Sequence, residues 1–239
     1  MELPVINVAP IHRVFLKVLD KDIEFSPYTI EQEKMILTSM ESEKFTDVLT
    51  NYKGILETCI KDDLDIMETP MVDLINLLIN LRVKSTDETI TLTRKECAEC
   101  EKPYDFNVDV EQSIIYENED TLKKIVKVDD RLKLELTPMT FKYFYDLEIT
   151  DGDLTAYDIM LTDVSHSISK VIFDGKIYTD HTPSDLCKKV LKGLSRGQIV
   201  KIHDDVKKLI SIHLEINSTC PHCEHKETNK VEDFLKFTN

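Results

Sequence analysis

Two cysteine pairs of the form Cys-x-x-Cys constrain the fold of this chain more than any other feature. The four residues are Cys97, Cys100, Cys220 and Cys223. A two-residue spacer lets both sulfurs of one turn face the same ion, and two such turns complete a tetrahedral zinc site of four thiolates. Here 119 residues lie between the two pairs, whereas roughly 15–20 are usual. A shared site therefore requires a fold that brings distant segments together.

Strand-like patterns surround both pairs. Ile90 and Leu92 alternate with threonines before the first pair, and segment 104–110 alternates apolar and polar residues after it. Segment 212–216 alternates in the same way before the second pair. Alternation with a period of two predicts a β-strand. We therefore expect each pair to lie in a turn after a strand, which is the context of a zinc knuckle.

One position in each turn departs from the usual knuckle. Glycine often follows the second cysteine, because the backbone there is left-handed. Glu101 and Glu224 occupy these positions instead, which argues against tight knuckles of the usual geometry. Ordinary reduced thiols at two turns are the simplest alternative to a metal site.

The remaining histidine and cysteine candidates are weaker. His222 and His225 could replace a ligand, but His222 lies inside the turn and both are expected to be exposed. Cys59 and Cys187 lie on apolar helical faces, so we interpret them as core thiols. Six cysteines in a chain of this length are too few for a disulfide scaffold.

Helical signals dominate the first third of the chain. Thr29 with Gln32 three residues later matches a capping box, which satisfies two backbone N–H groups at a helix start. Apolar residues recur at helical spacing over 45–60. Thr69 and Pro70 mark a third start, where the missing proline N–H costs nothing. These signals predict three helices around one core.

Hairpins and helices alternate in the second half. Segments 125–136 and 171–178 read as hairpins, the second turning at an Asp-Gly dipeptide suited to a type I′ turn. Further helices are expected after Thr182 and Ser195. The chain is therefore expected to be α+β: helix-rich, with small antiparallel hairpins and two CxxC β-knuckles.

The order of these signals predicts the domain organisation. Helices, a strand and a CxxC turn occur before residue 110 and again after residue 182, which suggests a duplicated helical–knuckle unit. We expect an N-terminal helical unit over 1–115 that ends in the first knuckle. Residues 116–239 would then hold the middle hairpins and a C-terminal helical unit ending in the second knuckle. A single compact domain is the alternative.

Composition excludes several functions. The formal net charge is −15, which opposes binding to nucleic-acid phosphates. The most apolar stretch, 71–83, is interrupted by polar residues and falls short of the roughly 20 residues that span a membrane. Glu2 stands where a secretory signal carries basic residues, so none is expected. Only five glycines are present, without a nucleotide-binding pattern.

Catalytic patterns are also missing from the sequence. It has no HExxH or GxSxG motif. A zinc ion held by four cysteines leaves no open position for chemistry. We therefore expect that the protein is not an enzyme.

The order of the motifs resembles that of the T4-type bacteriophage baseplate hub protein family. The segments that carry the resemblance are 23–37, 77–85, 97–100, 132–141, 184–210, 220–223 and 234–237. The resemblance implies a non-enzymatic tail protein that acts in baseplate hub assembly, as a hub subunit or an assembly chaperone. Its partners would be other hub proteins, with no nucleic acid, membrane or small-molecule substrate.

The same resemblance implies a location and a site. The protein would act in the host cytoplasm during assembly, and a hub subunit would also belong to the virion baseplate. Cys97, Cys100, Cys220 and Cys223 are carried over as a structural zinc site.

Two other functions are alternatives to the baseplate hub role. A zinc-ribbon module for nucleic acid or transcription would use the same cysteine pairs, but the net charge opposes it. A thiol oxidoreductase would need a CxxC at a strand-to-helix junction, where the helix N-terminus lowers the pKa of a thiol. Neither pair is followed directly by a helical pattern.

Overall fold

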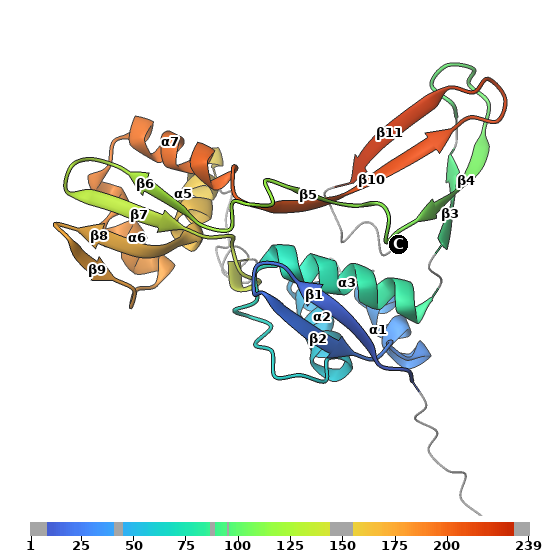
Figure 1. Cartoon of the computed structure of the whole chain (residues 1–239), viewed down its shortest axis with the longest axis horizontal. Coiled ribbons are helices and arrows are strands. Elements are labelled where there is room, and N and C mark those ends of the chain that lie inside the picture. The colour runs from blue at the N-terminus through green and yellow to red at the C-terminus, as the bar shows by residue number, and fades with distance from the viewer. Residues whose placement is uncertain (1–8, 41–44, 87–88, 95, 144–154, 232–239) are drawn as a thin grey trace, which may run out of the picture. The chain divides into compact units, whose positions relative to one another are not determined.

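The computed structural model describes residues 9–40, 45–86, 89–94, 96–143 and 155–231. The chain divides into two compact units (Figure 1). The first unit comprises residues 1–66, 73–115 and 212–239, and the second comprises 67–72 and 116–211. Besides the division at 115/116, the chain passes between the units at 66/67, 72/73 and 211/212, and the expected domains 1–115 and 116–239 stay a prediction. The segment from residue 212 belongs with the N-terminal part of the chain, not with the residues just before it.

The α+β class is confirmed by the elements of the described residues. The helices are α1 (Ile30–Met40), α2 (Phe45–Cys59), α3 (Met71–Ser85), α5 (Ala156–Ser167), α6 (Pro183–Lys189), the 3-10 helix η1 (Leu191–Gly193) and α7 (Arg196–Val206). The strands are β1 (His12–Leu16), β2 (Lys21–Phe25), β3 (Thr89–Arg94), β4 (Tyr104–Asp109), β5 (Ile114–Glu117), β6 (Lys124–Lys127), β7 (Leu132–Leu136), β8 (Ile168–Phe173), β9 (Lys176–Tyr178), β10 (Ser211–Thr219) and β11 (Lys226–Val231). The described strands form small antiparallel sheets. The duplication of a helical–knuckle unit stays a prediction.

In the first unit, three helices and the β1–β2 hairpin share a core. Leu16, Phe25, Leu56 and Leu74 are almost fully buried. The predicted capping box is present at the start of α1, where the Thr29 N–H donates to Gln32 Oε1 at 2.7 Å and the Gln32 N–H donates to Thr29 Oγ1 at 3.3 Å. The third helix begins at Met71, one residue later than expected with Thr69 as cap and Pro70 in the first turn, because Pro70 pairs with Thr140 in an isolated β-bridge.

Helix α3 also supports the strands that carry the cysteines. Ile79 and Val83 of α3 pack with Val110 and Leu214 in one buried cluster. The three-stranded sheet has the order β11-β10-β5, and β3 pairs with β4 separately. Both hairpins therefore belong to the first unit, although their sequences lie far apart.

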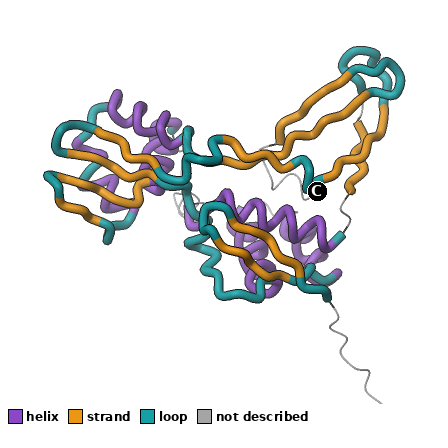
Figure 2. Tube along the Cα trace, viewed as in Figure 1, coloured by secondary structure: helices purple, strands orange, loops and turns teal. Residues whose placement is uncertain are grey.

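The described strands of the second unit form a four-stranded sheet with the order β6-β7-β8-β9. Its helices gather beside the sheet (Figure 2), and Leu134, Val164, Leu186 and Ile199 are buried in its core. The predicted type I′ turn is present, because Asp174 and Gly175 have φ angles of 48° and 76°. None of the described helices has the length and apolar character needed to cross a membrane.

Candidate metal centre

The first cysteine pair lies in the turn between β3 and β4. The two strands are antiparallel, with Arg94 opposite Tyr104. The Cys97 N–H donates to the Lys102 carbonyl at 2.9 Å, and the Glu101 N–H donates to the Cys97 carbonyl at 2.9 Å. These two bonds close the backbone around the cysteines.

The second pair lies in an equivalent turn between β10 and β11. Thr219 is opposite Lys226, the Cys220 N–H donates to the His225 carbonyl at 2.9 Å, and the Glu224 N–H donates to the Cys220 carbonyl at 2.9 Å. The two turns thus share one hydrogen-bond pattern at matching positions. The structure brings together the two knuckles that the sequence predicts.

The residue after each pair has the conformation that usually selects glycine. Glu101 has a φ of 59° and Glu224 a φ of 60°, both in the left-handed region. A residue with a side chain is strained there by roughly 1–2 kcal/mol. The expectation that the missing glycines disfavour the usual knuckle geometry is therefore wrong, because the rest of each turn holds the glutamate in this conformation.

The four sulfurs converge on one point. The Sγ atoms of Cys97 and Cys223 are 3.7 Å apart, as are those of Cys100 and Cys220, and all four sulfurs lie within 4.8 Å of one another. A tetrahedral ion with bonds of about 2.3 Å to sulfur places its ligands about 3.8 Å apart. The donor set and its spacing fit a tetrahedral four-thiolate metal ion.

The cluster is closed on its inner side by apolar packing. Cys97 and Cys220 are buried, whereas Cys100 is partly buried and Cys223 is exposed. Tyr104 packs in the same buried cluster. The site is therefore shielded on one side and open to solvent on the other.

Backbone N–H groups set the electrostatics of the sulfurs. The N–H groups of Cys100 and Glu99 lower the pKa of the Cys97 thiol to about 6. The His225 N–H acts in the same direction on Cys223, but desolvation and the neighbouring thiols outweigh it and raise the pKa of Cys223 to about 12. Without a cation, the cluster therefore favours one thiolate over several. A divalent ion would supply the charge that lets the others ionise.

The other sequence candidates lie outside this cluster. His222 is exposed, and its Nε2 lies 3.3 Å from the carbonyl oxygen of Pro103 on the other knuckle. Cys59 is buried, and this burial raises the pKa of its thiol. Cys187 is partly buried and packs against the core of the second unit. Both are core thiols, as expected.

The redox alternative lacks the structural context it requires. Strand β4 follows Cys100, and strand β11 follows Cys223. Neither pair therefore lies at a helix N-terminus, where the helix dipole would lower the pKa of a thiol.

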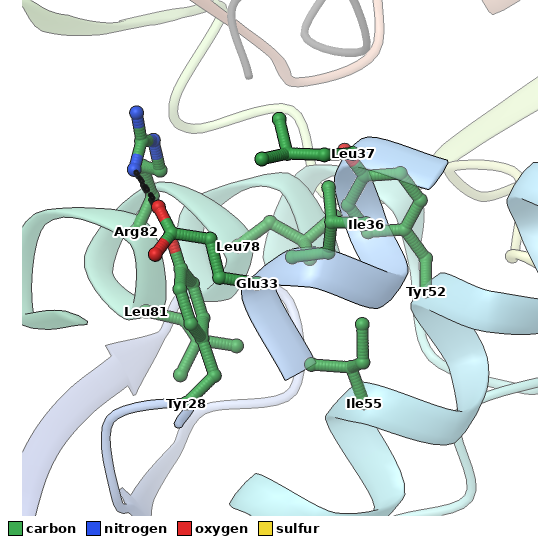
Figure 3. A pocket seen from close by; sticks show the side chains of 9 residues that line it. All are labelled: Tyr28, Glu33, Ile36, Leu37, Tyr52, Ile55, Leu78, Leu81 and Arg82. Atoms are coloured by element: carbon green, nitrogen blue, oxygen red, sulfur yellow. Dashed lines mark hydrogen bonds and ion pairs between the residues drawn. The ribbon is translucent and has the colours of Figure 1, made fainter. Parts of the chain in front are cut away.

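A small cavity in the first unit offers no ligand site of comparable quality (Figure 3). Its volume is about 40 Å³, room for a few water molecules at most. The Glu33 side chain points toward Arg82, 3.7 Å from its Nη1, and this same Nη1 donates to Tyr28 Oη at 3.0 Å. These contacts tie α1 to α3.

The second unit also holds a polar cluster that the sequence does not indicate. Tyr143 donates to Asp163 Oδ1 at 2.5 Å, and His203 Nε2 lies 2.9 Å from Asp163 Oδ2. Asp163 is on α5 and His203 is on α7, so the cluster ties two helices together. No spacing in the sequence could have indicated it, because 40 positions separate the carboxylate from the imidazole.

Comparison with known proteins identifies the family of this chain. No curated protein and no solved structure matches the chain. The family model described as T4 bacteriophage base plate protein matches residues 9–238, which is nearly the whole chain. The chain therefore belongs to the T4 bacteriophage base plate protein family.

Proposed function

We propose that this base plate protein acts in assembly of the baseplate hub, as a hub subunit or assembly chaperone, and that its four cysteines hold a structural zinc ion. The observation that carries the zinc proposal is the convergence of two equivalent knuckles, with Sγ atoms 3.7 Å apart across them. Family membership supports the base plate role. The hub and assembly roles rest on the order of the motifs.

Zinc is the ion that suits this donor set best. Soft thiolate ligands in a tetrahedral arrangement favour zinc or iron over harder cations such as magnesium and calcium. Four cysteines fill every position of a tetrahedral ion, so the site is structural and leaves no position for a substrate. We accordingly propose no catalytic activity for the protein.

The ion would hold the β3–β4 and β10–β11 hairpins together within the first unit. The β3–β4 and β10–β11 hairpins come from segments more than 100 residues apart. Bringing such distant segments together costs loop-closure entropy, and metal binding contributes directly to the free energy of folding. A bound ion would therefore stabilise the return of residues 212–231 to the N-terminal part of the chain.

Metal analysis of the purified wild-type protein tests the zinc proposal. We expect one zinc per chain in protein prepared without added metal. Cys220→Ser should lower both metal content and thermal stability, while Cys187→Ser, outside the cluster, should keep the zinc. Wild-type protein without zinc would contradict the proposal, and stoichiometric iron would assign the site to a different metal.

Co-purification from infected cells tests the assembly role. The tagged protein should associate with baseplate hub proteins and should show no binding to DNA or RNA at low salt. Association with no hub protein would contradict the role, and tight nucleic-acid binding would favour the zinc-ribbon alternative.

A further inference from the structure

A groove of about 530 Å³ opens on the second unit. Its volume lies in the range of specific ligand sites. Its apolar wall includes Leu132, Val171, Phe173, Tyr178, Leu186 and Val190. The groove lies entirely within the second unit, so its shape depends only on elements that pack together in one core.

The groove lies where aromatic side chains of the sheet remain exposed. The strand register places Leu134, Val171 and Tyr178 in one row across β7, β8 and β9. Leu134 is fully buried, but Tyr178 at the end of this row is 48% exposed. Phe173, two residues from Val171 and therefore on the same face, is 40% exposed. Helix α6 has only seven residues, and these two rings remain open to solvent.

Strand β9 beside the groove is an edge strand in the described sheet. Phe173 and Lys176 flank the two-residue turn and form a hydrogen-bonded pair. Pairs along an antiparallel ladder alternate, so the next pair, Ile172 and Ile177, is not hydrogen-bonded. The N–H and C=O of Ile177 therefore point away from β8. They can pair with a further strand, which is how sheets recruit extended peptides.

The charges at the groove select the partner. Asp129, Asp180 and Asp185 line it beside Lys189. Lys189 is paired with Asp185 at 2.7 Å. Within the described residues, Asp129 bonds only the N–H groups of its own turn, and Asp180 has no ion pair. Neither carboxylate forms an ion pair within the described residues, although Asp129 also attracts Arg131 through space, and together they give the groove a negative potential that complements a basic segment.

One aromatic wall of the groove is held in place before any partner binds. Arg131 lies 4.7 Å over the ring of Phe173. Its Nε donates to Asp174 at 2.8 Å, in a pair that also involves the terminal nitrogen. Asp174 offsets most of the charge of Arg131, which also attracts Asp129, so this guanidinium reduces the negative potential of the groove only in part.

We propose that β9 and this groove bind an extended, basic segment of another base plate protein by strand addition. Backbone bonds would form at Ile177, alternate apolar side chains would enter the groove beside Tyr178, and lysine or arginine side chains would reach Asp129 and Asp180. This inference rests on the proposed assembly role, for which it names the contact surface.

Binding of model peptides to the full-length protein tests the proposal. The probes are two fluorescein-labelled, end-capped octapeptides, one of alternating lysine and valine and one of alternating glutamate and valine. Fluorescence anisotropy should show at least tenfold tighter binding of the lysine peptide. The double variant Asp129→Asn with Asp180→Asn should lose most of this preference, since asparagine keeps the turn acceptor of Asp129 but removes the charge.

Two variants at Ile177 separate strand addition from general attraction to an acidic protein. Ile177→Pro removes the outward N–H without breaking a β8–β9 bond, because proline is tolerated on the free side of an edge strand. It should weaken binding at least tenfold at unchanged net charge. Ile177→Thr keeps the N–H and should bind like the wild type. Circular dichroism should show that all variants are folded.

Several results would overturn the inference. These are no binding of the lysine peptide, equal binding of the glutamate peptide, undiminished binding by Ile177→Pro, or a wild-type dimer that Ile177→Pro dissociates. The last would assign the edge to a second copy of this chain. Zinc content and co-purification with hub proteins are measured separately, so the groove proposal can fail while the proposed function stands.

Discussion

Tyr104 and Ser218 share a buried hydrogen bond of 2.9 Å between their hydroxyl groups, although 114 positions separate them in the sequence. Tyr104 begins β4, and Ser218 lies near the end of β10. The bond therefore joins the two hairpins close to the sulfur cluster. It provides a contact between the knuckles that does not depend on a metal ion.

Tyr104→Phe should lower the free energy of unfolding by about 1 kcal/mol, because it leaves the buried Ser218 hydroxyl without its partner. Ser218→Ala should cost a similar amount. The double variant should cost less than the two together, since both changes remove one bond. Urea unfolding measures all three, with Tyr157→Phe on the exposed part of α5 as a control that should change little. Strictly additive losses would show that the two hydroxyls are not coupled.

Glu101→Gly and Glu224→Gly should each stabilise the protein by about 0.5–1 kcal/mol, because glycine adopts a positive φ without strain. Glu99→Gly, within the first turn but without a positive φ, should have the opposite effect through the added freedom of the unfolded chain. Thermal unfolding of the metal-loaded proteins measures the differences. A loss of stability in the first two variants would mean that the glutamate side chains have a stabilising role of their own.

Chelation of the bound metal should loosen the two knuckles selectively. Hydrogen exchange should become faster over residues 96–104 and 219–226, because metal binding and local folding are coupled. Helices α5 and α7 belong to the second unit and should keep their exchange rates. In Cys220→Ser the chelator should have no further effect. Equal acceleration throughout the chain would argue that the metal supports both units.

Acid should weaken the start of α6 through Asp185. Its bonds to Lys189 and Thr182 lower the pKa of this carboxyl to about 2, from an unfolded value of roughly 4. A lowered pKa stabilises the folded state above the unfolded pKa, and this contribution is lost as the pH falls from about 4 to about 2.

Melting temperatures measured between pH 6 and pH 2 test this pH dependence. Asp185→Asn should flatten the curve in the acid range relative to the wild type. Asp180→Asn serves as the control, because the described residues give Asp180 no ion pair. Protonation of the cysteine thiolates affects the melting temperature of all these proteins alike, so the difference between their curves reports Asp185 alone. Parallel curves for the wild type and Asp185→Asn would contradict the prediction.

Local features were predictable because they depend on neighbours in the sequence. The capping box at Thr29 and the type I′ turn at Asp174 both involve residues within four positions of each other. The expectation that glycine follows the second cysteine failed at Glu101, because it does not take those neighbours into account. It considers one residue alone, whereas the surrounding hydrogen bonds of the turn determine whether that residue accepts a positive φ.

The sequence by itself determined the class of the elements, the two cysteine pairs that cluster and the family. The tertiary structure alone decided that Cys97 lies beside Cys223, that residues 212–231 join the N-terminal unit, and that Tyr178 on edge strand β9 stays exposed. The reason is physical: periodicity and spacing report contacts within a few residues. The pairing of distant segments instead depends on the summed packing of many buried side chains, such as Ile79 against Leu214.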